Sequence, residues 1–155
     1  MRILMVCLGN ICRSPLAHGI MRHLAAERGL GWTVESAGTG NWHVGDPPDR
    51  RAIAVAKQYG VDISRQRAQH FNATMFDQYD HILVMDRSNY RDVLGLAKTD
   101  EHRAKVRLFL GSDEVPDPYY DDGMFEPVYA MVEARCRSLM DTLSANGNRR
   151  EASRA

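Results

Sequence analysis

The sequence lacks an excess of charge of either sign, a long apolar run and a large set of cysteines. Twenty Lys and Arg residues balance twenty Asp and Glu residues, so the chain has no bulk positive field to attract nucleic acid or an anionic membrane. No stretch approaches the ~20 apolar residues that span a bilayer, and the apolar run after Met1-Arg2 is too short for a signal peptide. Three cysteines, an odd number, do not suit a secreted disulfide framework. We therefore expect a cytoplasmic protein that binds neither nucleic acid nor membrane.

The chain has 155 residues, the length of a single domain, and 44% of them are hydrophobic, as is usual for a globular protein. Short runs typical of buried strands occur at residues 2–7, 32–37, 81–85 and 105–110. They alternate with helices expected from Ser14, as N-cap, to Gly29, over 50–59 and over 86–94, before a long helix from Phe125 through Leu143. This alternation predicts an α/β fold, a single three-layer domain over residues 1–145 with helices on both faces of a parallel sheet. The polar tail 146–155 is expected to be disordered.

The segment Cys7-Leu-Gly-Asn-Ile-Cys-Arg-Ser14 lies between the first expected strand and the first helix. A loop ahead of a helix N-terminus directs backbone N–H groups and the positive end of the helix dipole inward, which forms an anion site. We expect Gly9 and Asn10 to adopt the unusual φ angles of such a loop, and Arg13 to match two phosphate oxygens. Cys7 then lies beneath the anion as a thiolate, ready for in-line attack on phosphorus. The alternative is that Cys7 is a small buried residue and Arg13 a surface residue.

Two other uses of this loop do not fit the sequence. No Gly-Lys-Ser/Thr follows Gly9, which excludes a Walker-type NTPase loop. Cys7 and Cys12 have no second ligand pair, and the histidines show no ligand spacing, which argues against zinc.

The opening segment resembles that of the low-molecular-weight protein tyrosine phosphatases, and the similarity continues to about Leu143. It includes the motifs Glu35–Thr39, Trp42–Asp49, Val84–Asn89 and Val115–Tyr120. The resemblance implies a sheet with strand order 2-1-3-4 and hydrolysis of phosphotyrosine without a metal or other cofactor. It also implies a phosphotyrosine-containing protein as partner, for example a tyrosine kinase, and a monomer or weak dimer.

The leaving group needs a proton donor, since expelling a bare phenolate of pKa about 10 is costly. Composition alone does not single out Asp117 from the other acids of residues 113–122, which also suit an acidic surface loop. The resemblance assigns the acid to Asp117 and makes Cys7 and Arg13 the other catalytic residues. The expected substrate-binding residues are Leu8, Gly9, Asn10, Ile11, Cys12, Ser14, Trp42, Tyr119 and Tyr120. The resemblance adds Ser36, which with Asn10 forms the pair of residues whose side chains fix the loop shape, although ordinary turn chemistry also explains each of them. It also adds Asp86 as a supporting carboxylate, although helix N-capping also explains Asp86.

Several points stay open at this stage. In the family a cysteine at the place of Cys12 can form a reversible disulfide with the nucleophile, but a thiol that only fills space is the alternative. Cys136, on the apolar stripe of the last helix, is expected in the core. The segment 63–70 departs from the family pattern, so we assign it no role.

Three rival functions share parts of this pattern. An arsenate reductase needs further cysteines, and residues 75–100 contain none. A sugar-transport phosphocarrier needs neither Arg13 nor Asp117. An arginine phosphatase of the same family has threonine in place of Ile11, so Ile11 and the two tyrosines favour an aryl substrate.

Overall fold

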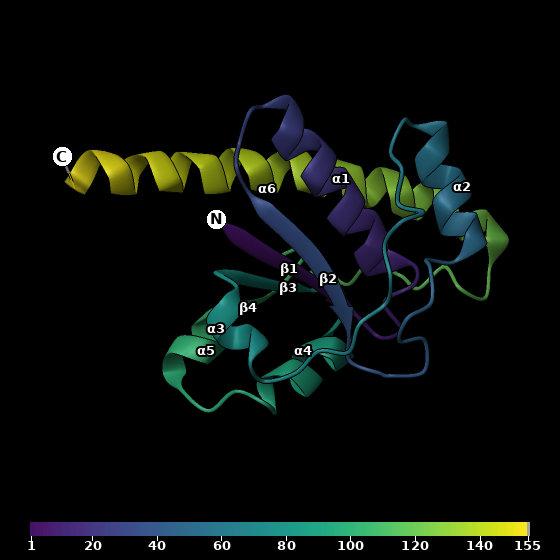
Figure 1. Cartoon of the computed structure of the whole chain (residues 1–155), viewed down its shortest axis with the longest axis horizontal. Helices are drawn as coiled ribbons and strands as arrows, with labels where there is room; N and C mark the ends of the chain where they lie inside the picture. Colours follow the sequence, from purple (N-terminus) through teal and green to yellow (C-terminus); the bar gives the residue numbers. More distant parts are fainter. Residues whose placement is uncertain (155) are drawn as a thin grey trace.

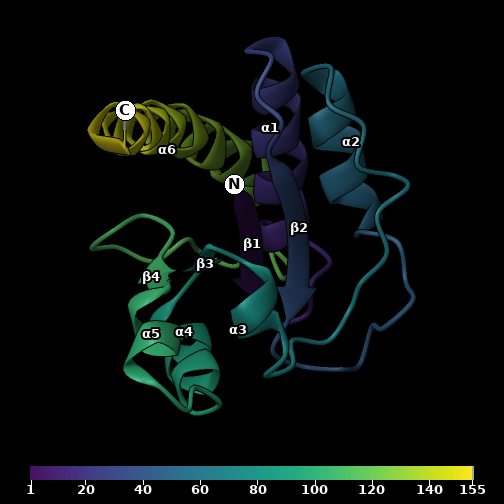
Figure 2. The ribbon, with the colours of Figure 1, turned by 60° about the vertical axis from the view of Figure 1, so that its left-hand side comes forward.

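The computed structural model has a four-stranded parallel sheet at its centre, as the sequence predicts. The strands are β1 (Arg2–Cys7), β2 (Thr33–Gly38), β3 (His81–Val84) and β4 (Val106–Leu108), in the order β2-β1-β3-β4. The structure describes the chain through residue 154 and its side chains through residue 145. All four strands run in the same direction, so their carboxyl ends meet at one edge of the sheet (Figures 1 and 2).

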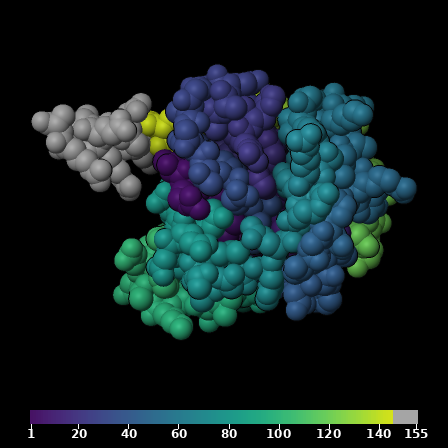
Figure 3. Space-filling view, viewed as in Figure 1, coloured from purple at the N-terminus to yellow at the C-terminus, as the bar shows by residue number. Residues whose placement is uncertain are grey.

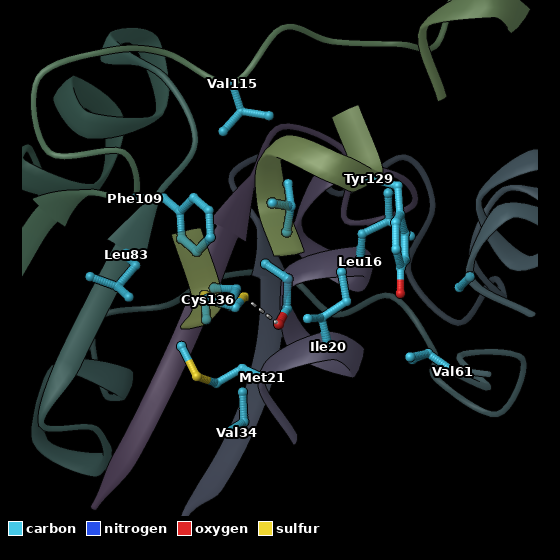
Figure 4. Close-up of a cluster of buried hydrophobic side chains, with 14 of the residues drawn as sticks. Leu16, Ile20, Met21, Val34, Val61, Leu83, Phe109, Val115, Tyr129 and Cys136 are labelled. Carbon is cyan, nitrogen blue, oxygen red and sulfur yellow. Dashed lines mark hydrogen bonds between the residues drawn. The ribbon is translucent and has the colours of Figure 1, made fainter. Parts of the chain in front are cut away.

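Helices cover both faces of the sheet. One face carries α1 (Arg13–Glu27), α2 (Arg50–Gln58) and α6 (Phe125–Arg154). The other carries α3 (Met75–Gln78), α4 (Arg87–Leu94) and α5 (Asp100–Ala104), and a 3-10 turn, η1 (Asp122–Met124), precedes α6. Strand β1 supplies both cores because successive side chains alternate between the faces. Ile3 and Met5 join the cluster under α1 and α6, and Leu4 and Val6 join the cluster under α3 and α4 (Figure 4 shows part of the first cluster).

The connection between α2 and α3 packs against α1 and β2 and thereby braces the loop after β1. Ile63 lies so close to α1 that a side chain at Gly19 would collide with it. Gln66 donates to the Pro15 carbonyl, and Gly38 at the end of β2 donates to the Gln69 carbonyl. In the space-filling view this connection, in teal, crosses the face toward the viewer (Figure 3).

Some local expectations were wrong. Helix α1 begins at Arg13 with Cys12 at its N-cap, so Ser14 is not the cap, and its hydroxyl points to Cys7 instead. The short elements α3, α5 and η1 were not predicted, because a single turn carries too little periodicity to detect. The expected tail falls within α6, and the side chains of residues 146–155 lie outside the described residues, so its disorder stays a prediction. Within the described part of the chain, no helix is both long and apolar enough to cross a membrane.

Candidate active site

The loop between β1 and α1 encloses the sulfur of Cys7. The backbone N–H of Asn10 donates to Cys7 Sγ at 3.3 Å, and Ser14 Oγ lies 3.0 Å from the same sulfur. Cys7 is 3% exposed. Asn10 has φ 56°, the left-handed conformation that we expected, whereas Gly9 does not have positive φ. A Cβ at residue 9 would lie 3.3 Å from the ring of His43, so that ring would have to move by a few tenths of an ångström to admit a side chain there.

Arg13, the first residue of α1, is buried and held in one orientation. Its Nη1 donates to Asp86 Oδ2 at 2.8 Å and to the Val115 carbonyl at 3.1 Å, while Nη2 lies 3.8 Å from Asp117 Oδ2. Burial by itself lowers the pKa of Arg13, but the negative charges of Cys7, Asp86 and Asp117 outweigh it and raise that pKa. Arg13 is therefore a permanent cation next to the Cys7 sulfur, with its Nη2 side directed toward Asp117.

Asp86 serves both of the purposes that the sequence left open. Its Oδ2 accepts from Arg13, and its Oδ1 caps helix α4 by accepting from the Asn89 N–H at 2.8 Å. The carboxylate is thereby fixed from two sides, and it orients the guanidinium rather than reaching the cavity itself.

Asp117 lies at the mouth of the site, with its side chain 40% exposed. Its Oδ1 accepts from the Tyr119 N–H at 3.1 Å, which leaves Oδ2 on the side of Arg13. Pro116 and Pro118 flank it and restrict the backbone of this turn. Asp117 is the one acid of the 113–122 loop among the residues that line the cavity.

A cavity of about 340 Å³ opens above Cys7 and Arg13. The remaining residues that line it are Leu8, Gly9, Ile11, Cys12, Trp42, His43, Asp117, Tyr119 and Tyr120. Of the residues expected to bind substrate, Asn10 and Ser14 do not line the cavity but lie beneath it, where the Asn10 amide donates to Ser14 Oγ at 2.8 Å. Trp42 and Tyr120 form an exposed aromatic rim, with 70% and 90% of their surfaces accessible.

Two residues near this site were missed by the sequence analysis. His43 lines the cavity, and its Nδ1 lies 3.2 Å from Asp46 Oδ2; its position next to Trp42 was the available signal. Gln69 belongs to the segment to which we assigned no role, yet its backbone N–H donates to Asn10 Oδ1 and its side chain donates to the Ser36 carbonyl.

Asn10 and Ser36, which we expected to fix the shape of the loop, are linked through Gln69. The Ser36 hydroxyl pairs instead with His18 Nδ1, at 2.9 Å. Among the described hydrogen bonds, none joins the side chains of Asn10 and Ser36 directly. The loop is thus supported by a residue from the connection before α3, which local sequence patterns do not reveal.

The other two cysteines have different surroundings. Cys12 lines the cavity as a free thiol, and burial together with the charges of Asp49 and Cys7 raises its pKa well above the ordinary range, so that it is protonated at neutral pH. Cys136 is fully buried in the core, as expected, with its sulfur near the Ala17 carbonyl (Figure 4). In the described portion, no group of three or more His, Cys, Asp or Glu side chains is arranged to hold a metal ion.

Comparison with known proteins agrees with this geometry. Residues 2–149 match the family described as low molecular weight phosphotyrosine protein phosphatase. The chain is 40% identical over 151 residues to a low molecular weight protein-tyrosine-phosphatase of Streptomyces coelicolor, covering 90% of this chain and 91% of the relative.

Two solved structures bear on the site. Wzb of Vibrio vulnificus, in complex with benzylphosphonate, is 32% identical with a TM-score of 0.82, covering 91% of this chain and 97% of that one. The Drosophila arginine phosphatase is also 32% identical, with a TM-score of 0.85, covering 92% of this chain and 98% of that one. With the match extending over nearly its whole length, the chain belongs to the low molecular weight protein tyrosine phosphatase family.

Proposed function

We propose that this protein hydrolyses phosphotyrosine and small aryl phosphates without a metal, through a cysteinyl-phosphate intermediate. The observation that carries the proposal is the convergence of Cys7, Arg13 and Asp117 on one cavity, although Asp117 is more than a hundred residues away from the other two in the sequence. A phosphoryl group placed above the sulfur contacts loop N–H groups and the Arg13 guanidinium. These groups stabilise the negative charge on the phosphoryl oxygens, which in other phosphatases is the task of a metal ion.

In the first step, the Cys7 thiolate attacks phosphorus, forming the S–P bond as the P–O bond to the phenol breaks. Arg13 and the loop N–H groups hold the non-bridging oxygens, and Asp117 transfers its proton to the departing phenol oxygen. Asp117 supports this assignment because its partly exposed carboxyl lines the cavity within 3.8 Å of Arg13 Nη2.

In the second step, Asp117, now a carboxylate, accepts a proton from water as the water oxygen attacks phosphorus. The S–P bond breaks, inorganic phosphate is released and Cys7 returns to the thiolate. Ser14 Oγ, 3.0 Å from the sulfur, can donate to that thiolate and make it a better leaving group.

The lining of the cavity supports an aromatic leaving group. Ile11, Trp42, Tyr119 and Tyr120 provide apolar and aromatic surface around the charged base of the site. The benzylphosphonate bound by the related Wzb protein has an aryl group near its phosphonate, which agrees with this assignment.

The decisive experiment measures p-nitrophenyl phosphate hydrolysis in EDTA with an alcohol as a second acceptor. We expect full activity in EDTA, and more p-nitrophenol than phosphate, because the alcohol captures part of the phosphoenzyme. The ratio should be the same for different aryl phosphates, since all form the same intermediate. Cys7→Ser should be inactive, whereas Cys12→Ser, in the same loop, serves as the matched control. Retained activity in Cys7→Ser would overturn the mechanism.

Phosphoarginine is the second candidate substrate, since the Drosophila arginine phosphatase has the same fold at 32% identity. Comparing kcat/KM for phosphotyrosine and phosphoarginine decides between them. We expect phosphotyrosine to be preferred, and Ile11→Thr to reduce that preference because it removes apolar surface from the wall. A preference for phosphoarginine in the unmodified protein would contradict the aryl assignment.

A further inference from the structure

A second hollow, of about 500 Å³, lies along the outer edge of the sheet. Strand β4 is at this edge, with α4 on one side of it and α6 on the other (Figure 2). The lining residues are Leu83, Arg87, Tyr90, Arg91, Val106, Arg107, Leu108, Gly111, Arg135 and Leu139. We refer to this set as the arginine groove, because it contains four arginines and, among the residues described, no acid.

The charges of this groove are largely uncompensated. Arg91 has no described ion pair, Arg107 Nη2 lies 3.3 Å from His81 Nδ1, and Arg135 donates to the Phe109 carbonyl. Burial and then the neighbouring charge of Arg107 lower the pKa of Arg135, as expected for cations placed near one another. In a chain of zero net charge, so much unpaired positive charge in one hollow indicates a surface suited to an anionic partner.

Among the described residues, one arginine of the groove has a carboxylate partner, and the distance between the two is long. Arg87 lies 3.7 Å from Glu114, and its guanidinium also donates to the Ser112 carbonyl. Among the described side chains, the other three arginines of the groove have no carboxylate within ion-pair distance.

The strand in the middle of the groove has an unpaired edge. Lys105 and Phe109 make backbone hydrogen bonds to β3, and alternate residues of a parallel strand bond to opposite sides. The backbones of Val106 and Leu108 therefore face outward. The Leu108 carbonyl already accepts a hydrogen bond from the Gly111 N–H. The N–H groups of Val106 and Leu108 and the carbonyl of Val106 are therefore available to pair with an added strand.

We propose that the arginine groove binds an extended acidic segment of the phosphoprotein substrate, which adds to the edge of β4 as a fifth strand. Side chains of an added strand alternate between the faces, so its acids meet Arg107 and Arg135 on one side and Arg87 and Arg91 on the other. This inference rests on the proposed function for the identity of the partner.

The groove and the active site each have an arginine in contact with the loop of residues 111–117. Arg87 contacts this loop at Ser112 and Glu114, and Arg13 contacts it at Val115. One substrate chain can therefore place a phosphotyrosine in the cavity and an acidic segment in the groove. Simultaneous binding at two linked sites raises the affinity for such a chain above that for phosphotyrosine alone.

Binding is tested first with an unphosphorylated probe, fluorescein-labelled hexaglutamate, followed by fluorescence anisotropy. We expect saturable, salt-sensitive binding, weakened about tenfold or more in the double variant Arg91→Glu/Arg107→Glu. The matched control is Arg22→Glu/Arg65→Glu, which reverses two exposed arginines elsewhere and changes the net charge equally. A probe N-methylated at alternate residues should bind more weakly, because it cannot complete the strand pairing.

The kinetic test uses a phosphotyrosine peptide with a hexaglutamate extension and the same peptide with a hexaglutamine extension. The acidic extension should raise kcat/KM in the unmodified protein, and the Arg91→Glu/Arg107→Glu variant should lose that advantage while hydrolysing p-nitrophenyl phosphate at the unchanged rate. Probe binding without phosphatase activity would refute the proposed function but would support the binding role of the groove. Activity without probe binding would refute the groove.

Three further results would also overturn this proposal. If both double variants bound the hexaglutamate probe equally weakly, the binding would be explained by overall charge and not by the groove. No binding at all would mean that the arginines only prevent unwanted strand pairing at the edge. Self-association of the protein that is abolished by Arg91→Glu/Arg107→Glu would assign the groove to the acidic loop of residues 113–122 of a second copy.

Discussion

Acidification should destabilise this protein in a way that depends on one buried histidine. His18, one turn after Ser14 on α1, is 5% exposed. Its Nδ1 pairs with the Ser36 hydroxyl, and its Nε2 has no hydrogen-bond partner among the described residues, with Glu35 at 3.9 Å. Burial, assisted by the charge of Arg22, lowers the pKa of His18 to about 4 from an ordinary value of 6.5.

The sign and size of the effect follow from these two values. Between pH 6.5 and about 4 the unfolded chain binds a proton at His18 and the folded protein does not, so folding becomes less favourable as the pH falls. Above pH 6.5 both states are neutral and the group contributes nothing. Since one pKa unit corresponds to about 1.4 kcal/mol, the full loss is about 3 kcal/mol, of which about 2.5 kcal/mol is reached by pH 4.5.

The assay is urea unfolding of the unmodified protein and His18→Gln across this pH range. Glutamine does not titrate but can still bond to Ser36. We expect the variant to gain about 2.5 kcal/mol relative to the unmodified protein between pH 7 and pH 4.5. Asp49 and Asp62, whose pKa values hydrogen bonds lower, also lose stabilisation in acid, but equally in both proteins. Parallel stability curves would refute the reasoning, because they would show that His18 does not titrate differently on folding.

Three further predictions concern the active site. Asp117→Ala should reduce kcat on phosphotyrosine by about a hundredfold and on p-nitrophenyl phosphate by much less, since the better leaving group needs less help from an acid; equal losses would remove Asp117 from that role. Asp86→Asn should lower kcat while leaving the urea midpoint nearly unchanged, because asparagine still caps α4, whereas Asp86→Ala should also cost about 1 kcal/mol of stability. Iodoacetate at pH 7 should modify Cys7 and spare Cys12, whose raised pKa keeps it protonated; mass spectrometry would show the reverse if Cys12 were the reactive thiol.

The order of elements and the sheet could be predicted because they depend on local pattern and on few topological choices. Continuous apolar runs such as residues 2–7 indicate strands buried on both faces, and their alternation with helices leaves a parallel sheet as the consistent arrangement. The strand order came from family resemblance, and the structure confirms it. The single-turn elements were missed because one turn carries too little periodicity, and the N-cap of α1 was assigned wrongly because the Ser14 hydroxyl contacts Cys7 instead.

By itself, the sequence singled out the loop between β1 and α1 as a candidate phosphate site, because the pattern lies within eight consecutive positions. Family resemblance pointed to Asp86 and Asp117, but the contacts that support the loop are seen only in the tertiary structure. Asp86 reaches Arg13 from after β3, Gln69 reaches Asn10 from before α3, and Asp117 arrives from the segment after β4. The arginine groove likewise exists only because α4, β4 and α6 meet at one sheet edge. A parallel sheet brings residues that are distant in the sequence together at the carboxyl ends of its strands, and no local sequence pattern shows which residues meet there.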